Sequence, residues 1–328
     1  MNKLTALYRN VDIHADKSIA PGITNNGGGT TTKIYHTTRA LPSLKVINEI
    51  EEAGIISIAE ILWFHELGFD EMLKRLDQWS ALESFKMLMT SDVELLRLPG
   101  DIRDQLIDAS DVILCLTQYV YNMFRAFTPK VAVLYDPIDI DMFKPQPKAN
   151  KIFGSGQITV EKNVQAVIDI FDSLPDSYEL DTEYIGSTNL WTSNSMKDEG
   201  AGLEAKLKAV CTRVLNNVPY TQMPDSIGQM WGYVADSRYD FSSYAMTEAM
   251  ACGCWIFTGR HLMYDERPGE RFKTTAEAVK LIAERLKSDP PGSGSINEEA
   301  RQFVVDQNSY DNFRKQFKQI IGEVSLGL

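Results

Sequence analysis

The sequence predicts an α/β protein built from two Rossmann-like domains with a cleft between them. The chain has 328 residues, a length that favours two domains over one. In each half, short apolar runs typical of buried strands alternate with helical stretches, which indicates a parallel sheet covered on both faces. Between the halves, residues 136–150 contain three prolines and no helical period, so they are predicted to be an interdomain linker.

The elements of the first half are predicted by local periodicity and punctuation. Apolar runs that predict strands span residues 4–8, 55–61, 85–89, 112–116 and 131–135. Helical stretches lie near residues 40–53, 67–82, 100–108 and 117–126. Alternation at this spacing is typical of a sheet whose parallel strands are connected by helices.

The second half repeats this alternation. A strand over 151–156 ends in glycines, and the helix after it has an apolar face made by Val164, Val167, Ile168 and Phe171. Another strand is expected at 180–185. The last helix carries one apolar stripe, made by Tyr310, Phe313, Phe317, Ile320 and Ile321. We therefore expect an N-terminal domain over 1–147, a C-terminal domain over 148–308, and a helix over 309–328 that crosses back to the N-terminal domain.

The composition is that of an ordinary globular protein. Apolar residues make up 44% of the chain and charged residues 24%, a balance typical of soluble domains. The start shows no signal-peptide pattern and no apolar run could cross a bilayer, so we expect a cytoplasmic protein without an integral membrane segment. The cysteines are scattered and are expected to be reduced thiols. Cys252 and Cys254 form a C-x-C without further ligands nearby, so no metal site is predicted.

The net charge of −12 bears on the partners of the protein. Proteins that bind phosphate polymers or anionic lipid by bulk electrostatics carry basic surfaces. This chain has 33 basic and 45 acidic side chains, so nucleic acid and membranes are disfavoured as partners. A local basic patch on this acidic protein remains an alternative.

Two glycine-rich stretches predict contacts with an anion or a sugar. The first, PGITNNGGGTTT at 21–32, contains Gly28 and lies between a predicted strand and a helix, where backbone N–H groups can approach a ligand. It is not the dinucleotide G-x-G-x-x-G pattern, and a flexible surface loop is the alternative. The second, GSGQITVEKN at 154–163, places Lys162 at a helix start, where ammonium and helix dipole could hold a diphosphate. An exposed lysine without a ligand is the alternative.

The stretch DFSSYAMTEAMACG, residues 240–253, predicts a short helix with Ser242 or Ser243 as N-cap and Gly253 closing its end. Glu248 lies inside this apolar helix, and a buried carboxylate is costly unless something satisfies it. A ligand near the N-terminal turn would do so, because a carboxylate can accept two hydrogen bonds from a diol. A partly solvated helix glutamate is the alternative.

Three motifs resemble those of family 4 glycosyltransferases, which have the GT-B fold, and they stand in the same order between Ser110 and Thr258. SDVILCLTQYVYNMFRAFTPKVAVLYDPIDIDMFKP is similar to the segment that closes the first domain of that family, with DPID and MFKP in the places of its asparagine-glycine-valine-aspartate turn and its phenylalanine-x-proline. GQITVEKN is similar to the glycine-arginine-leucine…glutamate-lysine-glycine/asparagine element. DFSSYAMTEAMACGCWIF resembles the E-x7-E signature and the run after it, the most specific of the three.

The resemblance implies two facing Rossmann domains, a nucleotide-sugar donor bound in the cleft, transfer with retention, and no metal ion or other cofactor. By matching position, Glu248 would bind the donor ribose hydroxyls and Asp240 would contact the transferred sugar. Lys162 would hold the diphosphate. The resemblance implies help with the diphosphate from the turn at Gly156 and from the backbone amides of Ser242, Ser243 and Tyr244.

Two residues depart from the family pattern. Gln157 stands where the family has an arginine that binds the diphosphate, and the loss of one charge-assisted contact costs about 1.5–3 kcal/mol. Asp240 replaces a glutamate, which shortens its reach by one methylene. Arg260, just after the predicted strand CWIFTGR, is a candidate substitute for the missing arginine.

In the first half the resemblance is thinner. LWFHELGFDEML, residues 62–73, resembles a histidine-glutamate element at the end of a first-domain strand, which makes His65 the candidate cleft histidine near the donor sugar. A core or strand-end histidine without a role is the alternative. His14 and His36 flank the first glycine loop and are weaker candidates.

Together these observations predict a glycosyltransferase that moves a hexosyl or pentosyl group from a nucleoside diphosphate sugar to the hydroxyl of a sugar or another small acceptor. His65, Asp240 and Lys162 are the candidate catalytic residues. Gln157 raises the alternative of a catalytically silent nucleotide- or sugar-binding subunit. Transfer to modified, hydroxymethylated nucleic-acid bases is a second alternative, which the shared fold supports and the net charge opposes.

Overall fold

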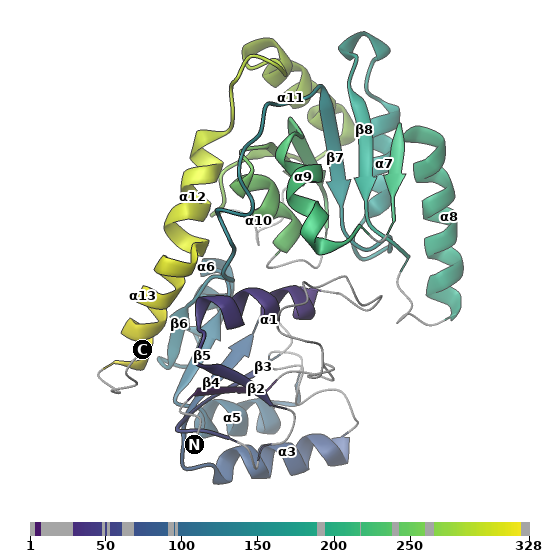
Figure 1. Ribbon diagram of the computed structural model, residues 1–328. Coiled ribbons are helices and arrows are strands. Elements are labelled where there is room, and N and C mark those ends of the chain that lie inside the picture. The colour runs from purple at the N-terminus through teal and green to yellow at the C-terminus, as the bar shows by residue number, and fades with distance from the viewer. Residues whose placement is uncertain are drawn as a thin grey trace. The chain divides into compact units, whose positions relative to one another are not determined.

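The computed structural model confirms an α/β protein with two parallel sheets. It describes residues 4–7, 29–47, 50, 53–60, 69–90, 95, 98–188, 194–216, 218–237, 243–259 and 266–322. Within these ranges the chain divides into two compact units (Figure 1). The first unit takes the described residues through Pro137 and from Asn308 onward, and the second takes Ile138–Gln307.

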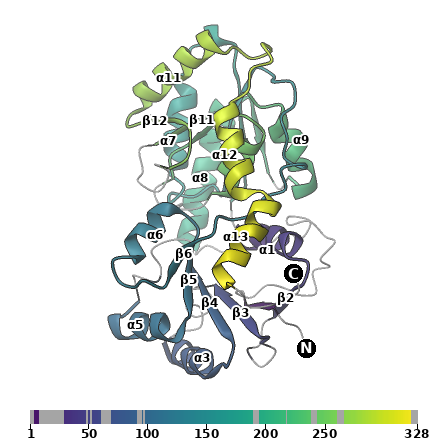
Figure 2. The ribbon, with the colours of Figure 1, turned by 90° about the vertical axis from the view of Figure 1, so that its left-hand side faces the viewer.

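The first unit is built on a six-stranded parallel sheet with the strand order β2-β1-β3-β4-β5-β6. Its strands are β1 Leu4–Leu7, β2 Leu44–Ile47, β3 Ile56–Glu60, β4 Phe85–Thr90, β5 Val112–Cys115 and β6 Val131–Val133. Its helices are α1 Gly29–Ala40, α3 Phe69–Ala81, α5 Gly100–Ala109, α6 Gln118–Phe124 and α13 Tyr310–Ile321. Helices α3 and α5 pack together on one face of the sheet, and α1 and α13 pack together on the other (Figures 1 and 2).

One predicted helix of this unit is wrong. The sequence predicted helix near 40–53, whereas the structure places strand β2 at Leu44–Ile47, paired in parallel with β1. Pro42 cannot extend α1, which ends at Ala40. The residues after the proline include Val46 and Ile47, whose branched side chains favour a strand that packs in the core.

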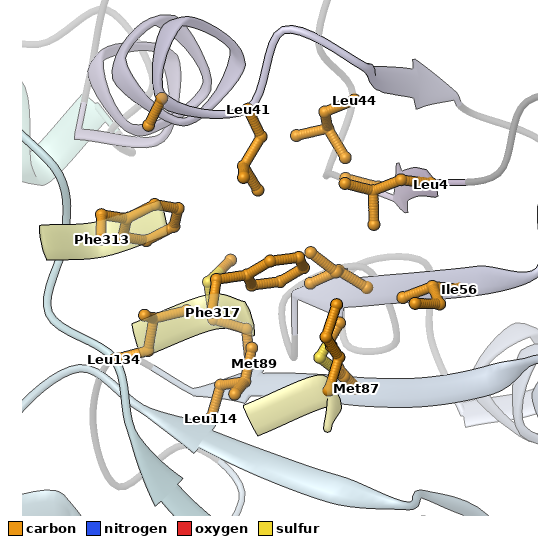
Figure 3. Packing of buried hydrophobic residues seen from close by; sticks show 14 of the residues in the cluster. Leu4, Leu41, Leu44, Ile56, Met87, Met89, Leu114, Leu134, Phe313 and Phe317 are labelled. Carbon is orange, nitrogen blue, oxygen red and sulfur yellow. The ribbon is translucent and has the colours of Figure 1, made fainter. Parts of the chain in front are cut away.

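The C-terminal helix completes the core of the first unit (Figure 3). Phe313 and Phe317 of α13 stack with ring centroids 6.3 Å apart, and Phe317 is fully buried. In Figure 3 both rings lie among side chains that come from the sheet and from the end of α1; the labelled ones are Leu4, Leu41, Leu44, Ile56, Met87, Met89, Leu114 and Leu134. The apolar stripe predicted for the last helix is confirmed, and it packs on the N-terminal sheet.

The second unit is built on another six-stranded parallel sheet, with the order β12-β11-β10-β7-β8-β9. Its strands are β7 Lys151–Ser155, β8 Asp181–Ile185, β9 Arg213–Leu215, β10 Gly232–Ala235, β11 Trp255–Gly259 and β12 Glu270–Phe272. Its helices are α7 Val164–Asp172, α8 Asn194–Val210, α9 Met223–Gly228, α10 Tyr244–Ala251, α11 Thr275–Ser288 and α12 Glu298–Asn308, with short 3-10 turns η2 Asp176–Tyr178 and η3 Tyr220–Gln222. The predicted apolar face of α7 is confirmed, because Val164, Val167, Ile168 and Phe171 are all buried.

The strand order of the second sheet fixes where a ligand would bind. The chain runs from β7 outward to β8 and β9, and then continues on the other side of β7 with β10, β11 and β12. In open α/β sheets, ligands bind at the carboxyl ends of the two strands between which the order reverses. Here these strands are β7 and β10, and in the first sheet they are β1 and β3.

Two further findings concern the thiols and the helices. All four cysteines are free, and three of them, Cys115, Cys252 and Cys254, are buried. Over the ranges given above, no helix is both long enough and apolar enough to cross a bilayer.

We expect Phe317→Ala to lower the free energy of unfolding by about 3–5 kcal/mol, because it removes a fully buried ring and leaves a cavity. Lys315→Ala changes an exposed position of the same helix and should alter the free energy of unfolding by less than about 0.5 kcal/mol. Urea unfolding followed by circular dichroism measures both variants. Two equally small effects would mean that α13 does not complete this core.

Candidate functional site

The candidate site lies in the second unit, at the edge where β7 and β10 end. After β7 the chain turns at Gly156, whose φ of 138° is one that other residues rarely adopt. A Cβ on Gly186, which follows β8, would stand 1.8 Å from the carbonyl oxygen of Gly156. Glycine is therefore required at position 186 for the two turns to approach each other. This approach brings the ends of β7 and β8 close together at the edge where a ligand would bind.

The turn after β7 leads directly into helix α7. Asn163 precedes the helix with φ 48° and ψ 43°, a left-handed conformation that asparagine tolerates better than most residues. Its Nδ2 donates a hydrogen bond of 2.7 Å to Oδ2 of Asp236, which follows β10. The start of α7 is thus tied to the end of β10, and the predicted position of Lys162 at a helix start is confirmed.

A small cavity lies between the ends of β7 and β10. It is lined by Ser155, Lys162, Val167, Tyr184, Tyr233, Val234, Ala235 and Ser237. Its volume of about 10 Å³ is enough for one water-sized group. The hydroxyl of Ser237 is buried there and, among the described residues, has no hydrogen-bond partner. A buried hydroxyl without a partner costs about 1–3 kcal/mol, so this position favours a polar atom of a ligand.

Helix α10 follows the end of β10 and begins as predicted. The hydroxyl of Ser243 accepts a hydrogen bond of 3.3 Å from the backbone N–H of Met246, and Gly253 follows the helix end with φ 71°. Thr247 donates to the carbonyl oxygen of Ser243 at 2.9 Å and accepts a hydrogen bond of 3.3 Å from the buried Arg267. These contacts fix the first turn of α10.

Glu248 is buried in the second turn of α10, with only 3% of its surface exposed. The hydroxyl of Tyr220 donates a hydrogen bond of 2.8 Å to its Oε1. No residue that the structure describes donates to its Oε2. Burial raises the pKa of Glu248 to about 7, and the Tyr220 hydrogen bond acts in the opposite direction. The alternative of a partly solvated glutamate is therefore wrong.

The carboxyl end of α10 is held by two basic side chains. Nζ of the buried Lys148 donates to the carbonyl oxygens of Cys252 at 2.7 Å and Gly228 at 2.8 Å. Arg301 donates to the carbonyl oxygen of Ala251. Positive charges at a helix C-terminus stabilise the helix dipole, so both ends of α10 are fixed.

Six of the predicted site residues lie in described segments that follow strands β7 and β10. Gly156, Gln157 and Lys162 lie in or just after the turn that follows β7, and Ser243, Tyr244 and Glu248 belong to α10 or its N-cap. Others lie outside the described residues, so their places stay predictions; these are His14, Gly28, His65, Asp240, Ser242 and Arg260.

His36 is not a ligand candidate. It lies on α1 and is fully buried, and its Nδ1 is 2.7 Å from the hydroxyl of Tyr310 on α13. Burial and the nearby Arg39 lower the pKa of His36 to about 3, so the ring stays neutral. Its role is to join two helices of the first unit.

Sequence reasoning missed Tyr220, Ser237, Arg267 and Lys148. Tyr220 and Ser237 carry no local pattern that marks them as more than a turn tyrosine and a strand-end serine. Lys148 lies in a segment predicted to be a linker, where a lysine is expected to be solvated. Only the folded chain shows which backbone and side-chain groups these residues contact.

Solved structures match the chain over 85–99% of its length, whereas no protein-family model and no curated protein matches it. Sucrose-phosphate synthase from Thermosynechococcus elongatus superposes with a TM-score of 0.75 at 12% identity, covering 98% of each chain. Anabaena HepE, in complex with UDP and glucose, superposes with a TM-score of 0.70 at 11% identity, covering 99% of this chain and 100% of that one. An α-glucosyltransferase in complex with UDP and a 13-mer DNA containing a central A:G mismatch superposes with a TM-score of 0.60 at 13% identity, covering 85% of each chain.

At these identities the similarity concerns the fold. The chain has the GT-B fold of these glycosyltransferases, with two α/β units that each contain a parallel six-stranded sheet. The fold class predicted from the sequence is confirmed.

The raised pKa of Glu248 predicts a pH-dependent stability that Glu248→Gln removes. A carboxyl group whose pKa rises from 4.5 to about 7 on folding stabilises the folded state fully below pH 4.5, and this contribution is lost as pH rises through 7. Between about pH 5.5 and 8, the wild type should lose about 2 kcal/mol of unfolding free energy relative to Glu248→Gln. Parallel urea titrations measure the difference, and a constant difference would contradict the raised pKa.

Proposed function

We propose that the protein is a glycosyltransferase that moves a sugar from a nucleoside diphosphate sugar to a hydroxyl acceptor, with retention and without a metal ion. The observation that carries the proposal is the carboxyl group of Glu248. It is buried on helix α10, which follows strand β10, and one of its oxygens accepts a hydrogen bond from Tyr220. Burying such a group is costly, and a ligand diol that donates to its other oxygen would offset the cost.

Other groups in the segments that follow β7 and β10 suit the rest of a nucleoside diphosphate. Lys162 lies at the end of the turn after β7 and lines the cavity together with Ser237. The backbone N–H groups at the start of α10 carry the positive end of the helix dipole. An ammonium group, a hydroxyl group and helix amides are the donors that phosphate oxygens require. HepE, which shares the fold, was solved with UDP, and this supports a nucleoside diphosphate as the donor part.

Catalysis would rest on stabilising the leaving group. In the proposed step the bond between the sugar C1 and the diphosphate oxygen breaks, and the acceptor oxygen forms a bond to C1 on the same face. Lys162 and the amides of α10 would stabilise the negative charge that develops on the diphosphate. The departing phosphate oxygen would take the acceptor proton, so no separate base is required. His65 and Asp240 remain the proposed contacts of the transferred sugar.

Gln157 keeps a second candidate function open. Because it supplies no positive charge to the diphosphate, the protein could bind a nucleotide sugar without transferring the sugar. Incubation with radiolabelled nucleotide sugars and a panel of hydroxyl acceptors separates the two functions. Labelled product supports transfer, whereas tight nucleotide binding without transfer or hydrolysis favours the binding subunit.

Lys162→Met should weaken binding of a nucleoside diphosphate by about 10- to 100-fold, because it removes one charge-assisted contact of about 1.5–3 kcal/mol. Binding of the nucleoside alone should change less than about twofold. Lys287→Met makes the same charge change at an exposed position of α11 and is the matched control. Isothermal titration calorimetry with a panel of nucleoside diphosphates measures these affinities. Equal losses in the two variants would point to bulk charge instead of a contact.

Glu248→Gln should weaken the nucleoside and the nucleoside diphosphate alike at about pH 8, where the wild-type carboxyl group is mostly ionised. The expected loss is about tenfold, since one acceptor oxygen becomes a donor. A 2′,3′-dideoxy analogue has no ribose diol and should bind both proteins equally. If Glu248→Gln left the affinity for the ordinary nucleotide unchanged, the carboxylate would have no part in the site.

Nucleic acid as an acceptor is a third candidate, because one solved structure with a similar fold is a complex with DNA. Duplex DNA carries one charge per about 1.7 Å and is bound by neutralising several phosphates. The net charge of −12 opposes this. We therefore expect no complex with unmodified or hydroxymethylated duplex at about 150 mM salt in a mobility-shift assay. A micromolar complex that weakens steeply with salt would favour the nucleic-acid acceptor.

A further inference from the structure

Tyr220 donates a hydrogen bond to the side chain of Glu248, although the two residues are far apart in the sequence. It lies in the short turn η3 just before α9, is itself buried, and donates to Oε1 at 2.8 Å across 28 residues of chain. Its ring packs against Phe143, with centroids 5.7 Å apart. The ring is thus fixed by packing, and its hydroxyl is directed at one oxygen of the carboxyl group.

We propose that Tyr220 is a positioning residue for Glu248: its hydroxyl holds Oε1, leaves Oε2 as the atom that accepts ligand hydroxyls, and favours the ionised form of the group. The inference rests on the proposed function in that Glu248 is taken to be the ligand-binding carboxylate. It adds a second residue that sets both the direction and the charge of that carboxylate.

The physical reason lies in the balance between burial and hydrogen bonding. Burial favours the protonated form of Glu248, and a hydrogen bond donated by Tyr220 favours the ionised form. With a pKa of about 7, the carboxyl group is divided between the two forms near neutral pH. Only the ionised form accepts hydrogen bonds at every lone pair, so ligand affinity should rise as pH increases through 7.

The other ionisable groups near α10 either hydrogen-bond residues of that helix other than Glu248 or belong to the segments beside it. Lys148 and Arg301 bind carbonyl groups at its C-terminal end, and Arg267 binds Thr247. In the part of the chain that the structure describes, the remaining ionisable groups on α10 and on the segments beside it are Asp225, Tyr233, Tyr244, Cys252 and Cys254. Among the described residues, Tyr220 is the one whose side chain hydrogen-bonds the carboxyl group itself, so its removal should act most directly on the ionisation of Glu248.

Tyr220→Phe tests the inference because it removes the hydroxyl and preserves the ring. The ionisation of Glu248 can be followed in the ligand-free protein by NMR of 13Cδ-labelled glutamate, with the signal assigned by its loss in Glu248→Gln. We expect the pKa of Glu248 to rise by about one unit in Tyr220→Phe, a tenfold change in proton affinity. Tyr178→Phe, a half-buried tyrosine of the same unit, should leave it unchanged.

Phe143→Leu separates positioning from packing. It weakens the contact with the Tyr220 ring and leaves the hydroxyl in place, so thermal stability should fall while the pKa of Glu248 stays within about 0.3 units of the wild type. An unchanged pKa in Tyr220→Phe would overturn the inference. An equal shift in Phe143→Leu and Tyr220→Phe would also overturn it, because the effect would then be structural.

UDP affinity provides the second readout. With a one-unit rise in pKa, Tyr220→Phe should bind UDP about eightfold more weakly than the wild type near pH 6.5 and less than about twofold more weakly near pH 8.5. A loss that is the same at both pH values would contradict the inference. If the wild type does not bind UDP, the proposed function is in question for this nucleotide, and the pKa of Glu248 in the free protein still decides the role of Tyr220.

Discussion

The parallel pairing of β7 with β10 brings together the groups that the second unit offers to a ligand. Ile152 pairs with Gly232 and Phe153 with Tyr233, so the carboxyl ends of the two strands lie at one edge of the sheet. The turn that leads to Lys162 starts from β7, and the segment that leads to α10 starts from β10. The hydrogen bond between Asn163 and Asp236 ties the two segments together. A different strand order would separate Lys162 from Ser237, and these two residues line the same cavity.

The second constraint is the burial of a carboxyl group in a helix made mostly of apolar residues. The fold tolerates Glu248 because Tyr220 satisfies one oxygen and because the raised pKa lets the group carry a proton when no donor is present. Lys148 and Arg301 fix the C-terminal end of the same helix, and Ser243 caps its start. The helix is therefore held at both ends. Its second turn carries the Glu248 carboxyl group, although an apolar side chain would be less costly to bury there. Under the proposed function, a ligand diol is the partner of this group.

The first unit depends on both ends of the chain. Its sheet contains β1 at the start of the sequence, and its core is completed by α13 near the end. Phe313 and Phe317 supply the rings that fill the space against the sheet, and the contact between His36 and Tyr310 joins α13 to α1. Because α13 follows the second unit in the chain, the first unit cannot complete its core until residues 138–307 have been synthesised.

The sequence by itself determined the fold class, the alternation of strands and helices in both halves, and the helix that carries Glu248. These features depend on local periodicity, on capping residues such as Ser243 and on the order of motifs along the chain. Strand β2 was missed because its local signals, Pro42 and the branched Val46 and Ile47, are few, and a strand this short gains its stability from pairing with β1.

Only the tertiary structure decided that Glu248 is buried, that Tyr220 binds it and that Lys148 holds the end of its helix. These contacts join residues that are 28 and 104 positions apart in the chain. The ionisation of a carboxyl group depends on how much water the fold removes around it and on which donor the fold supplies, and both are properties of the packed chain.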